Sequence, residues 1–309
     1  MKQGKKVVVT GGAGFIGSHL AEELVKRGYK VTIVDDLSTG KMENVASLLG
    51  TGSLEFFRGS VTDLSLLQEL FQGVDYVFHH AALPSVPQSI EAPLASNDVN
   101  VSGTLKVLLA ARDNGVRKVI YASSSSIYSD DATLPQKEDS SPEPQSPYAV
   151  SKLAGECYCR VFQEVYGLPT VCLRYFNVYG PRCEPDSQYA AVIPRFIRRV
   201  SRGEPPIIYG DGEQTRDFVF VNDVVEANIL AIRSDFNGIF NIGVGESITI
   251  NQLAEVVINF AGNGLKPIHC EPNPGDVRQS LADISKAKAL GYAPRYSLER
   301  GLRELFYSR

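Results

Sequence analysis

Tyr148 and Lys152 are the residues whose types and spacing are best suited to chemistry. They stand four positions apart at the start of an expected helix, so their side chains share one face. A free phenol has a pKa of about 10, but a neighbouring ammonium stabilises the phenolate and lowers that pKa. Such a pair can take a proton from a hydroxyl group while a hydride leaves the same carbon. On its own, this spacing is common and more often belongs to a solvated helix face.

A glycine-rich segment offers a place for the hydride acceptor. Thr10-Gly11-Gly12-Ala13-Gly14-Phe15-Ile16-Gly17 lies between a strand predicted at 7–9 and a helix predicted over 15–27. Glycines let the backbone approach a pyrophosphate, whose charge is then met by amide groups at the helix N-terminus. This context favours a dinucleotide site over an ordinary glycine-rich turn. The next predicted strand ends at Asp35-Asp36, where a carboxylate can bind the adenosine ribose and repel the extra phosphate of NADP, so NAD is the predicted cofactor.

The elements that must position these groups alternate along the first half of the chain. Short β-rich runs at 7–9, 31–34, 54–57, 76–78 and 119–122 are separated by helix-length sequence, which predicts four or five parallel strands with helices on both faces. The fold class is therefore α/β, with a Rossmann-type doubly wound parallel sheet. After Pro169 the pattern loosens, and we expect a smaller α/β C-terminal lobe for the substrate. We place the NAD-binding domain at 1–170, with roughly 217–242 added, and the interleaved substrate lobe at 171–309.

Composition excludes several classes of protein. The formal net charge of the 309 residues is only −4, so there is no basic footprint for nucleic acid or for a membrane surface. We find neither an apolar stretch of membrane-helix length nor a signal-peptide core, and we expect a cytoplasmic protein. The five cysteines lack paired CxxC spacing, so reduced thiols and no metal are expected.

Together, these segments resemble the extended short-chain dehydrogenases/reductases, and most closely the UDP-hexose 4-epimerases. The resemblance covers essentially the whole chain, and it is specific because many motifs match in order. After the glycine loop come Val34-Asp35-Asp36-Leu37, His79-His80-Ala81-Ala82, Asn100 before Gly103-Thr104, Ser123-Ser124-Ser125, Tyr148 with Lys152, Arg174-Tyr175-Phe176-Asn177, and Arg216-Asp217.

The resemblance implies a role for individual residues. Tyr148 would be the catalytic base, Lys152 would lower its pKa and hold the nicotinamide ribose, and Ser124 would share a hydrogen bond with O4 of the sugar. The residues implied to bind NAD are Gly11, Gly14, Phe15, Ile16, Gly17, Asp35, Asp36, Ser38, Gly40, Ser60, Val61, Ala81, Ala82, Asn100, Tyr148, Lys152, Tyr175 and Phe176. The residues implied to bind the UDP-sugar are Ser124, Ser125, Asn177, Ala191, Val192, Tyr209, Arg216, Arg278 and Ser280, the arginines through the diphosphate.

The serine run separates the possible reactions. Relatives that eliminate water or carbon dioxide carry an acid beside the serine or threonine of this strand, whereas residues 123–128 contain none. The resemblance then favours oxidation at C4, rotation of the ketosugar and reduction from the other face, which is 4-epimerisation with NAD recycled. A nucleotide-sugar dehydratase or decarboxylase is the alternative, as is a UDP-glucuronate 4-epimerase in which Arg182 holds the carboxylate. A non-catalytic NAD-binding sensor is the alternative from another class, although such proteins usually lose the tyrosine or the lysine.

The identity of the sugar depends on a few positions. Ser280 stands where glucose-restricted epimerases tend to carry a tyrosine, and 188–194 resembles epimerases that accept N-acetylated sugars. We therefore expect UDP-GlcNAc and UDP-GalNAc beside, or instead of, UDP-Glc and UDP-Gal. The chain departs from many relatives at Ser60, where an aspartate commonly meets the adenine and Asp63 is a possible substitute. It also has Pro84 where some relatives carry a lysine.

The resemblance also implies a homodimer. Relatives pair through the helix that contains Tyr148 and a neighbouring helix, which in this chain carries the apolar residues Leu105, Val107, Leu108 and Leu109. The same side chains would also suit the core of a single subunit, and the sequence does not choose between the two.

Overall fold

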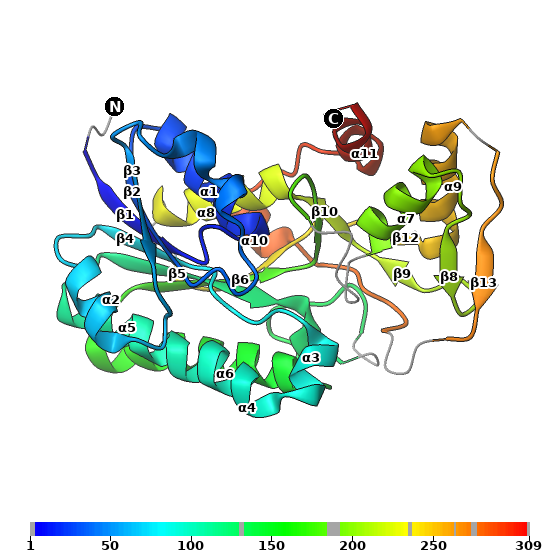
Figure 1. Ribbon diagram of the computed structural model, residues 1–309. Coiled ribbons are helices and arrows are strands. Elements are labelled where there is room, and N and C mark those ends of the chain that lie inside the picture. The colour runs from blue at the N-terminus through cyan, green and yellow to red at the C-terminus, as the bar shows by residue number, and fades with distance from the viewer. Residues whose placement is uncertain are drawn as a thin grey trace.

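A seven-stranded parallel sheet forms the centre of the molecule (Figure 1). The computed structural model describes residues 4–129, 133–183, 192–233, 237–262, 264–272 and 277–307. The strand order is β11-β6-β5-β4-β1-β2-β3, so it reverses between β1 and β4, where α/β folds bind their ligands. The strands are β1 (Lys6–Thr10), β2 (Lys30–Asp35), β3 (Leu54–Arg58), β4 (Tyr76–His79), β5 (Lys118–Ser124), β6 (Thr170–Tyr175) and β11 (Gly238–Ile242).

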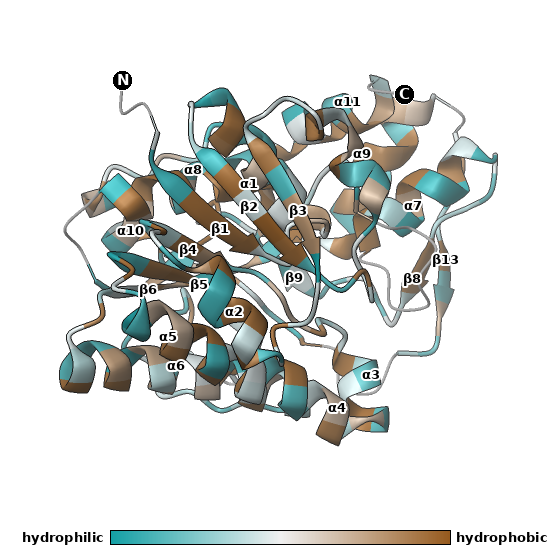
Figure 2. Ribbon diagram, turned by 60° about the vertical axis from the view of Figure 1, so that its left-hand side comes forward, coloured by the Kyte–Doolittle hydropathy of each residue, from teal (hydrophilic) through white to brown (hydrophobic). Residues whose placement is uncertain are grey.

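Helices cover both faces of this sheet, which confirms the Rossmann-type α/β class (Figure 1). Helices α1 (Phe15–Lys26), α8 (Val221–Arg233) and α10 (Ser285–Ala289) pack on one face. Helices α2 (Leu64–Leu70), α5 (Gly103–Asp113) and α6 (Pro147–Tyr166) pack on the other. Because both faces are buried, strands such as β1 are nearly continuous runs of valine, which Figure 2 shows as brown ribbon inside the layers.

The five runs predicted in the first half of the chain are β1 to β5, and two further strands complete the sheet. Strands β6 and β11 extend the sheet beyond β5, although both follow the point where the sequence pattern loosens. Each is short and its place is decided by pairing with a distant neighbour, which periodicity along the chain does not reveal. Among the described residues, no helix is long and apolar enough to cross a membrane.

The smaller lobe has its own hydrophobic core beside the carboxyl ends of the strands (Figure 1). It contains α7 (Val192–Ser201), α9 (Ile250–Ala261) and α11 (Leu298–Tyr307). Three two-stranded sheets complete it: β7 (Asn177–Tyr179) with β10 (Phe218–Phe220), β8 (Ile207–Tyr209) with β13 (Ile268–Cys270), and β9 (Thr215–Arg216) with β12 (Ile248–Thr249). Short helices α3 (Val86–Glu91) and α4 (Pro93–Asn97) lie against α6.

A buried carboxylate ties the lobe to the sheet. Asp217, between β9 and β10, accepts hydrogen bonds from the backbone N–H groups of Val244, Gly245 and Ala282. Burial raises the pKa of Asp217 to about 6, against the lowering effect of these donors. The carbonyl of Asp217 also accepts from the side-chain amide of Asn177 (3.1 Å). This link fixes Arg216 and Asn177 relative to the sheet.

Candidate active site

Tyr148 lies in the first turn of α6. The side chain of Ser146 caps this helix by accepting a hydrogen bond from the Ala149 N–H group (3.1 Å), and Pro147 occupies the first helical position, where its missing N–H costs nothing. One turn further, the Lys152 ammonium lies 5.8 Å from the centre of the Tyr148 ring and donates to the carbonyl of Ala122 (2.8 Å). The helix start therefore fixes both side chains against the end of β5.

Ser124, the last residue of β5, completes this cluster. Its hydroxyl hydrogen-bonds the Tyr148 phenol, which lowers the pKa of Tyr148, but burial is the larger effect and the net pKa is raised. Burial also lowers the pKa of Lys152 to about 8, while the charge of Glu156 acts to raise it. The Lys152 ammonium is directed to the Ala122 carbonyl, and its lowering of the Tyr148 pKa stays a prediction.

The glycine loop has the geometry of a phosphate cradle. Gly11 adopts φ +68°, and a Cβ added at Gly17 would lie 2.2 Å from the carbonyl oxygen of Gly11. Gly14 is the N-cap of α1 and supplies no side-chain hydrogen bond to the first turn. Main-chain N–H groups at this helix start can therefore bind a pyrophosphate, as a dinucleotide requires.

Asp35 stands beside this loop at the end of β2. Its carboxylate accepts from the N–H groups of Ala13 (2.9 Å) and Leu37 (2.8 Å), and a Cβ at Gly40 would press on the same oxygens. Burial raises the pKa of Asp35 in spite of these donors. A carboxylate has about four lone-pair sites, so Asp35 retains capacity for ribose hydroxyls.

These groups line a cavity of about 230 Å³, which would hold the dinucleotide. Most of the residues expected to bind NAD are among its lining: Gly11, Gly14, Phe15, Ile16, Gly17, Asp35, Asp36, Ser38, Val61, Ala81, Ala82, Tyr148, Lys152 and Tyr175. Four others, Gly40, Ser60, Asn100 and Phe176, are not. Asn100 is buried and holds the segment after β4 through the backbone of Leu83, Ser60 pairs with Thr62 (2.9 Å), and Phe176 packs against Tyr128 in the core.

A larger cavity of about 1010 Å³ opens next to the first and shares Gly14, Phe15 and Ile16 with it. Its lining includes four residues expected to bind the UDP-sugar, namely Asn177, Val192, Tyr209 and Arg216. Ser124, Ser125 and Ser280 do not line it. Ala191 lies outside the described residues.

Arg278 was expected to bind the diphosphate but is placed differently. Its guanidinium forms two hydrogen bonds with the carboxylate of Asp211 (2.8 and 2.9 Å), and its side chain is 57% exposed. It is absent from the lining of the larger cavity, although its neighbour Val277 is present. The position matches the family motif, but a local acidic partner holds the side chain at the surface.

Arg195 was not predicted from the sequence as a site residue. This residue lines the larger cavity from α7, and its guanidinium lies 5.2 Å from the centre of the Tyr209 ring. Gln214, another lining residue, donates to the Tyr209 carbonyl (2.8 Å). One signal was available: Arg195 follows Val192 by three positions on a helix, so the two share a face.

The described cysteines and acids give no sign of a metal centre. Cys157 is exposed whereas Cys159 is buried, so the two point in different directions from α6. Within the part of the chain that the structure describes, no three His, Cys, Asp or Glu side chains gather closely enough to hold a metal ion.

Comparison with known proteins agrees with this geometry. The chain matches the NAD dependent epimerase/dehydratase family over residues 7–243. It is 38% identical to a putative UDP-glucose 4-epimerase from Methanocaldococcus jannaschii, over 97% of this chain and 96% of that one. It is 39% identical to a UDP-N-acetyl-alpha-D-glucosaminuronate decarboxylase from Bacillus cytotoxicus, again over 97% and 96%.

Among solved structures, the chain resembles UDP-N-acetylglucosamine 4-epimerase from Methanobrevibacter ruminantium M1 in complex with UDP-N-acetylmuramic acid. The identity is 42% and the TM-score 0.94, over 99% of this chain and 100% of that one. Fold, site and matches agree with the resemblance inferred from the sequence motifs. This chain therefore belongs to the NAD-dependent epimerase/dehydratase family.

Proposed function

We propose that the protein is an NAD-dependent UDP-hexose 4-epimerase. The observation that carries this proposal is the position of Tyr148, which hydrogen-bonds Ser124 and lines the dinucleotide cavity, next to which a cavity large enough for a UDP-sugar opens. Typical small-molecule sites occupy about 300–1,000 Å³, so the larger cavity is of suitable size.

Each group has one role in the reaction. NAD, held by the glycine loop and Asp35, would supply the acceptor for the hydride of C4 and its return to the opposite face of the sugar. Tyr148 takes the proton of the 4-hydroxyl and gives it back in the reverse step, while Ser124 shares the hydrogen bond to O4. Proton and hydride are both returned, so the reaction involves no net redox change. Lys152 supplies the positive charge beside Tyr148.

Sequence identity does not distinguish 4-epimerisation from decarboxylation, because this chain is nearly equally similar to relatives named for each activity. Individual residues of the site do distinguish them. The serines at the end of β5 have no acidic neighbour in sequence. Glu156 does reach Ser123, but Arg174 holds both of its carboxylate oxygens (2.9 and 2.8 Å). Glu156 is therefore not available to protonate a leaving group or to deprotonate C5.

A uronate is also disfavoured as substrate. Arg182, the residue considered for a sugar carboxylate, lines the larger cavity but donates to Glu22 (2.6 Å) and to Ser18 (3.3 Å) on α1. The cavity of about 1010 Å³ is large enough for a sugar with an N-acetyl group. Ser280 does not provide this space, because it is buried and its backbone N–H donates to the carbonyl of Thr215 (3.2 Å). We propose UDP-GlcNAc and UDP-GalNAc as substrates, together with UDP-Glc and UDP-Gal.

The test is to incubate the purified protein and NAD separately with UDP-Glc, UDP-GlcNAc and UDP-GlcA, and to follow 4-epimer formation by NMR. We expect UDP-GlcNAc to give its 4-epimer, with or without turnover of UDP-Glc. Conversion of UDP-GlcA alone would show that the protein is a UDP-glucuronate 4-epimerase instead. No 4-epimer from any of the three would refute the proposal.

We further propose a cytoplasmic homodimer, with 1–170 and 217–242 forming the NAD-binding part and 171–309 mainly the UDP-sugar lobe. We place the contact surface on α6, the expected helix that contains Tyr148, and on α4 beside it. Val107 and Leu108 are fully buried in the subunit's own core and cannot contact a partner. Exposed apolar side chains lie on α6, at Val150, Val161 and Val165, and on α4, at Leu94.

A further inference from the structure

A buried ion pair lies directly behind the catalytic cluster. Glu156 on α6 and Arg174 on β6 have side chains only 2% exposed, and two hydrogen bonds join them (2.9 and 2.8 Å). Arg174 also donates to the hydroxyl of Tyr128 (2.7 Å), which in turn donates to Asn241 (2.7 Å).

The sheet register places this network beside the active site. Ser123 on β5 pairs with Arg174 on β6, which pairs with Asn241 on β11, so the three residues form one row across the sheet. The Ser123 hydroxyl donates to Glu156 (2.5 Å). Ala122 and Ser124, the neighbours of Ser123, contact Lys152 and Tyr148 respectively. Three successive residues of β5 thus contact three successive turns of α6, at Tyr148, Lys152 and Glu156.

We propose that Glu156, held by Arg174, is a positioning residue for the reaction: it locks the end of β5 against α6 and keeps a negative charge one turn below Lys152. This inference rests on the proposed function. Glu156 is not a catalytic residue, because its contacts are with Ser123 and Arg174 and it does not line the NAD or substrate cavity.

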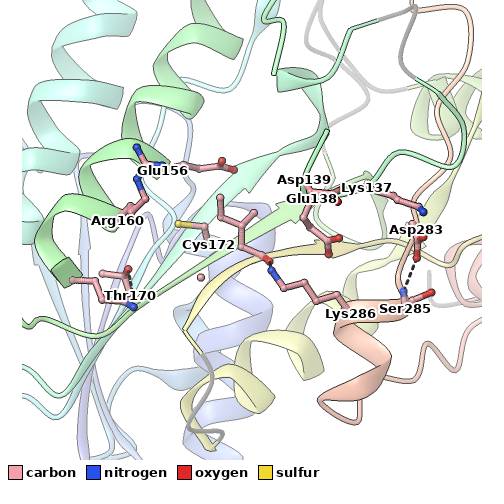
Figure 3. A pocket seen from close by; sticks show the side chains of 13 residues that line it. Lys137, Glu138, Asp139, Glu156, Arg160, Thr170, Cys172, Asp283, Ser285 and Lys286 are labelled. Carbon is pink, nitrogen blue, oxygen red and sulfur yellow. Dashed lines mark hydrogen bonds between the residues drawn. The ribbon is translucent and has the colours of Figure 1, made fainter. Parts of the chain in front are cut away.

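A contribution to folding stability does not by itself explain the buried Glu156–Arg174 ion pair. Taking two charges out of water is costly, and replacing a buried ion pair by apolar side chains is often neutral or stabilising. Glu156 also lines a separate cavity of about 570 Å³, together with Arg160 of α6, Cys172 of β6 and Lys286 of α10 (Figure 3). That cavity gives the carboxylate room to turn elsewhere, yet both oxygens are directed to Arg174 and Ser123. These contacts indicate that the ion pair serves to fix the geometry of β5 and α6 rather than to increase the stability of the fold.

The charge of Glu156 gives the proposal a specific signature. The titratable groups around Lys152 are Tyr148 and Glu156 on α6, Tyr121 on β5, and His79 and His80 at the end of β4. Burial lowers the pKa of Lys152 to about 8, and Glu156 is the group that opposes this. Without the carboxylate, Lys152 would lose its proton at lower pH. The alkaline limit of activity and of NAD binding should move to lower pH with it.

The test uses the double variant Glu156→Gln/Arg174→Met, which removes both charges and keeps an acceptor for Ser123. The single variant Glu156→Gln leaves the buried charge of Arg174 without its carboxylate partner and is expected to be strongly destabilised, so the double variant is the one to measure. Glu164→Gln, an exposed position on the same helix, is the matched control. We expect the double variant to melt near the wild type, with KM little changed and kcat lower by on the order of 10- to 100-fold.

The pH profile separates the possible outcomes. We expect the alkaline limb of kcat, and the pH at which NAD affinity is lost in calorimetric titrations, to shift downward in the double variant and not in Glu164→Gln. A folded double variant with wild-type kcat and wild-type pH limits would overturn the positioning role. If the wild type itself forms no 4-epimer, the proposed function fails, and the NAD-binding profile still tests Glu156.

Discussion

The position and orientation of the Tyr148 side chain are determined by a few neighbouring residues. The cap at Ser146 and the proline at 147 decide where α6 begins, and Ser124 fixes the direction of the phenol. Burial raises the pKa of Tyr148, so the phenol is protonated at neutral pH in the free protein. In the proposed reaction, the Lys152 ammonium is the positive charge beside Tyr148, because an adjacent cation stabilises the phenolate.

Removal of the phenol oxygen gives the first prediction at this scale. Tyr148→Phe keeps the ring and deletes the proton acceptor, so kcat for 4-epimer formation should fall about 10²- to 10⁴-fold. NAD affinity should stay near the wild-type value, because the glycine loop and Asp35 are unchanged. Tyr166→Phe is the control, at an exposed position of the same helix. An undiminished kcat in Tyr148→Phe would show that the base is another group.

At the scale of elements, the strand–loop–helix unit β1–α1 was predictable because its signals are local. Valines mark the strand, glycines the turn, and Gly14 and Phe15 the helix start. Asp35 was predictable for the same reason, since it ends the next strand. The predicted helix end at Arg27 differs by one residue from the observed end at Lys26, as frayed ends commonly do.

The close approach of Gly17 to Gly11 yields a prediction for this unit. In Gly17→Ala, the new methyl group would meet the Gly11 carbonyl oxygen at 2.2 Å, so the loop or α1 must shift. We expect a loss of about 1–3 kcal/mol in the free energy of unfolding and weaker NAD binding. In Gly14→Ala the nearest atom is 3.2 Å away, so the melting temperature should fall less. Thermal unfolding and NAD titration of both variants check this, and a wild-type result for Gly17→Ala would contradict it.

At the scale of the whole molecule, contacts between segments distant in sequence decide which side chains become neighbours. The row Ser123, Arg174 and Asn241 exists because β6 and β11 join the sheet, and no periodicity along the chain announces that pairing. Arg278 illustrates the converse case: its position fits a family motif, but Asp211, 67 positions away, holds it. Sequence patterns thus placed Tyr148 and Lys152 on one helix face and identified the glycine loop, whereas side-chain partners required the assembled fold.

The exposed face of α6 bears on assembly. Val150, Val161 and Val165 are 52%, 41% and 66% exposed, and at about 3.6 residues per turn they fall on one stripe. Leu94 on α4, which packs beside α6, is 85% exposed. A contiguous apolar face of this kind on a subunit marks an interaction surface, and a helix face suits pairing with a second copy of itself.

We therefore expect light scattering of the wild type to give twice the mass of one chain. Val161→Glu/Val165→Glu should give the mass of a single chain, because burying two unpaired carboxylates in the contact is costly. Ile268→Glu, which adds a charge at an exposed apolar position on β13, should leave the dimer intact. Since both valines point away from the core, the double variant should keep its melting temperature at low protein concentration, where the wild type also dissociates. A wild-type mass of one chain, or a dimer that tolerates both glutamates, would show that this face has another role.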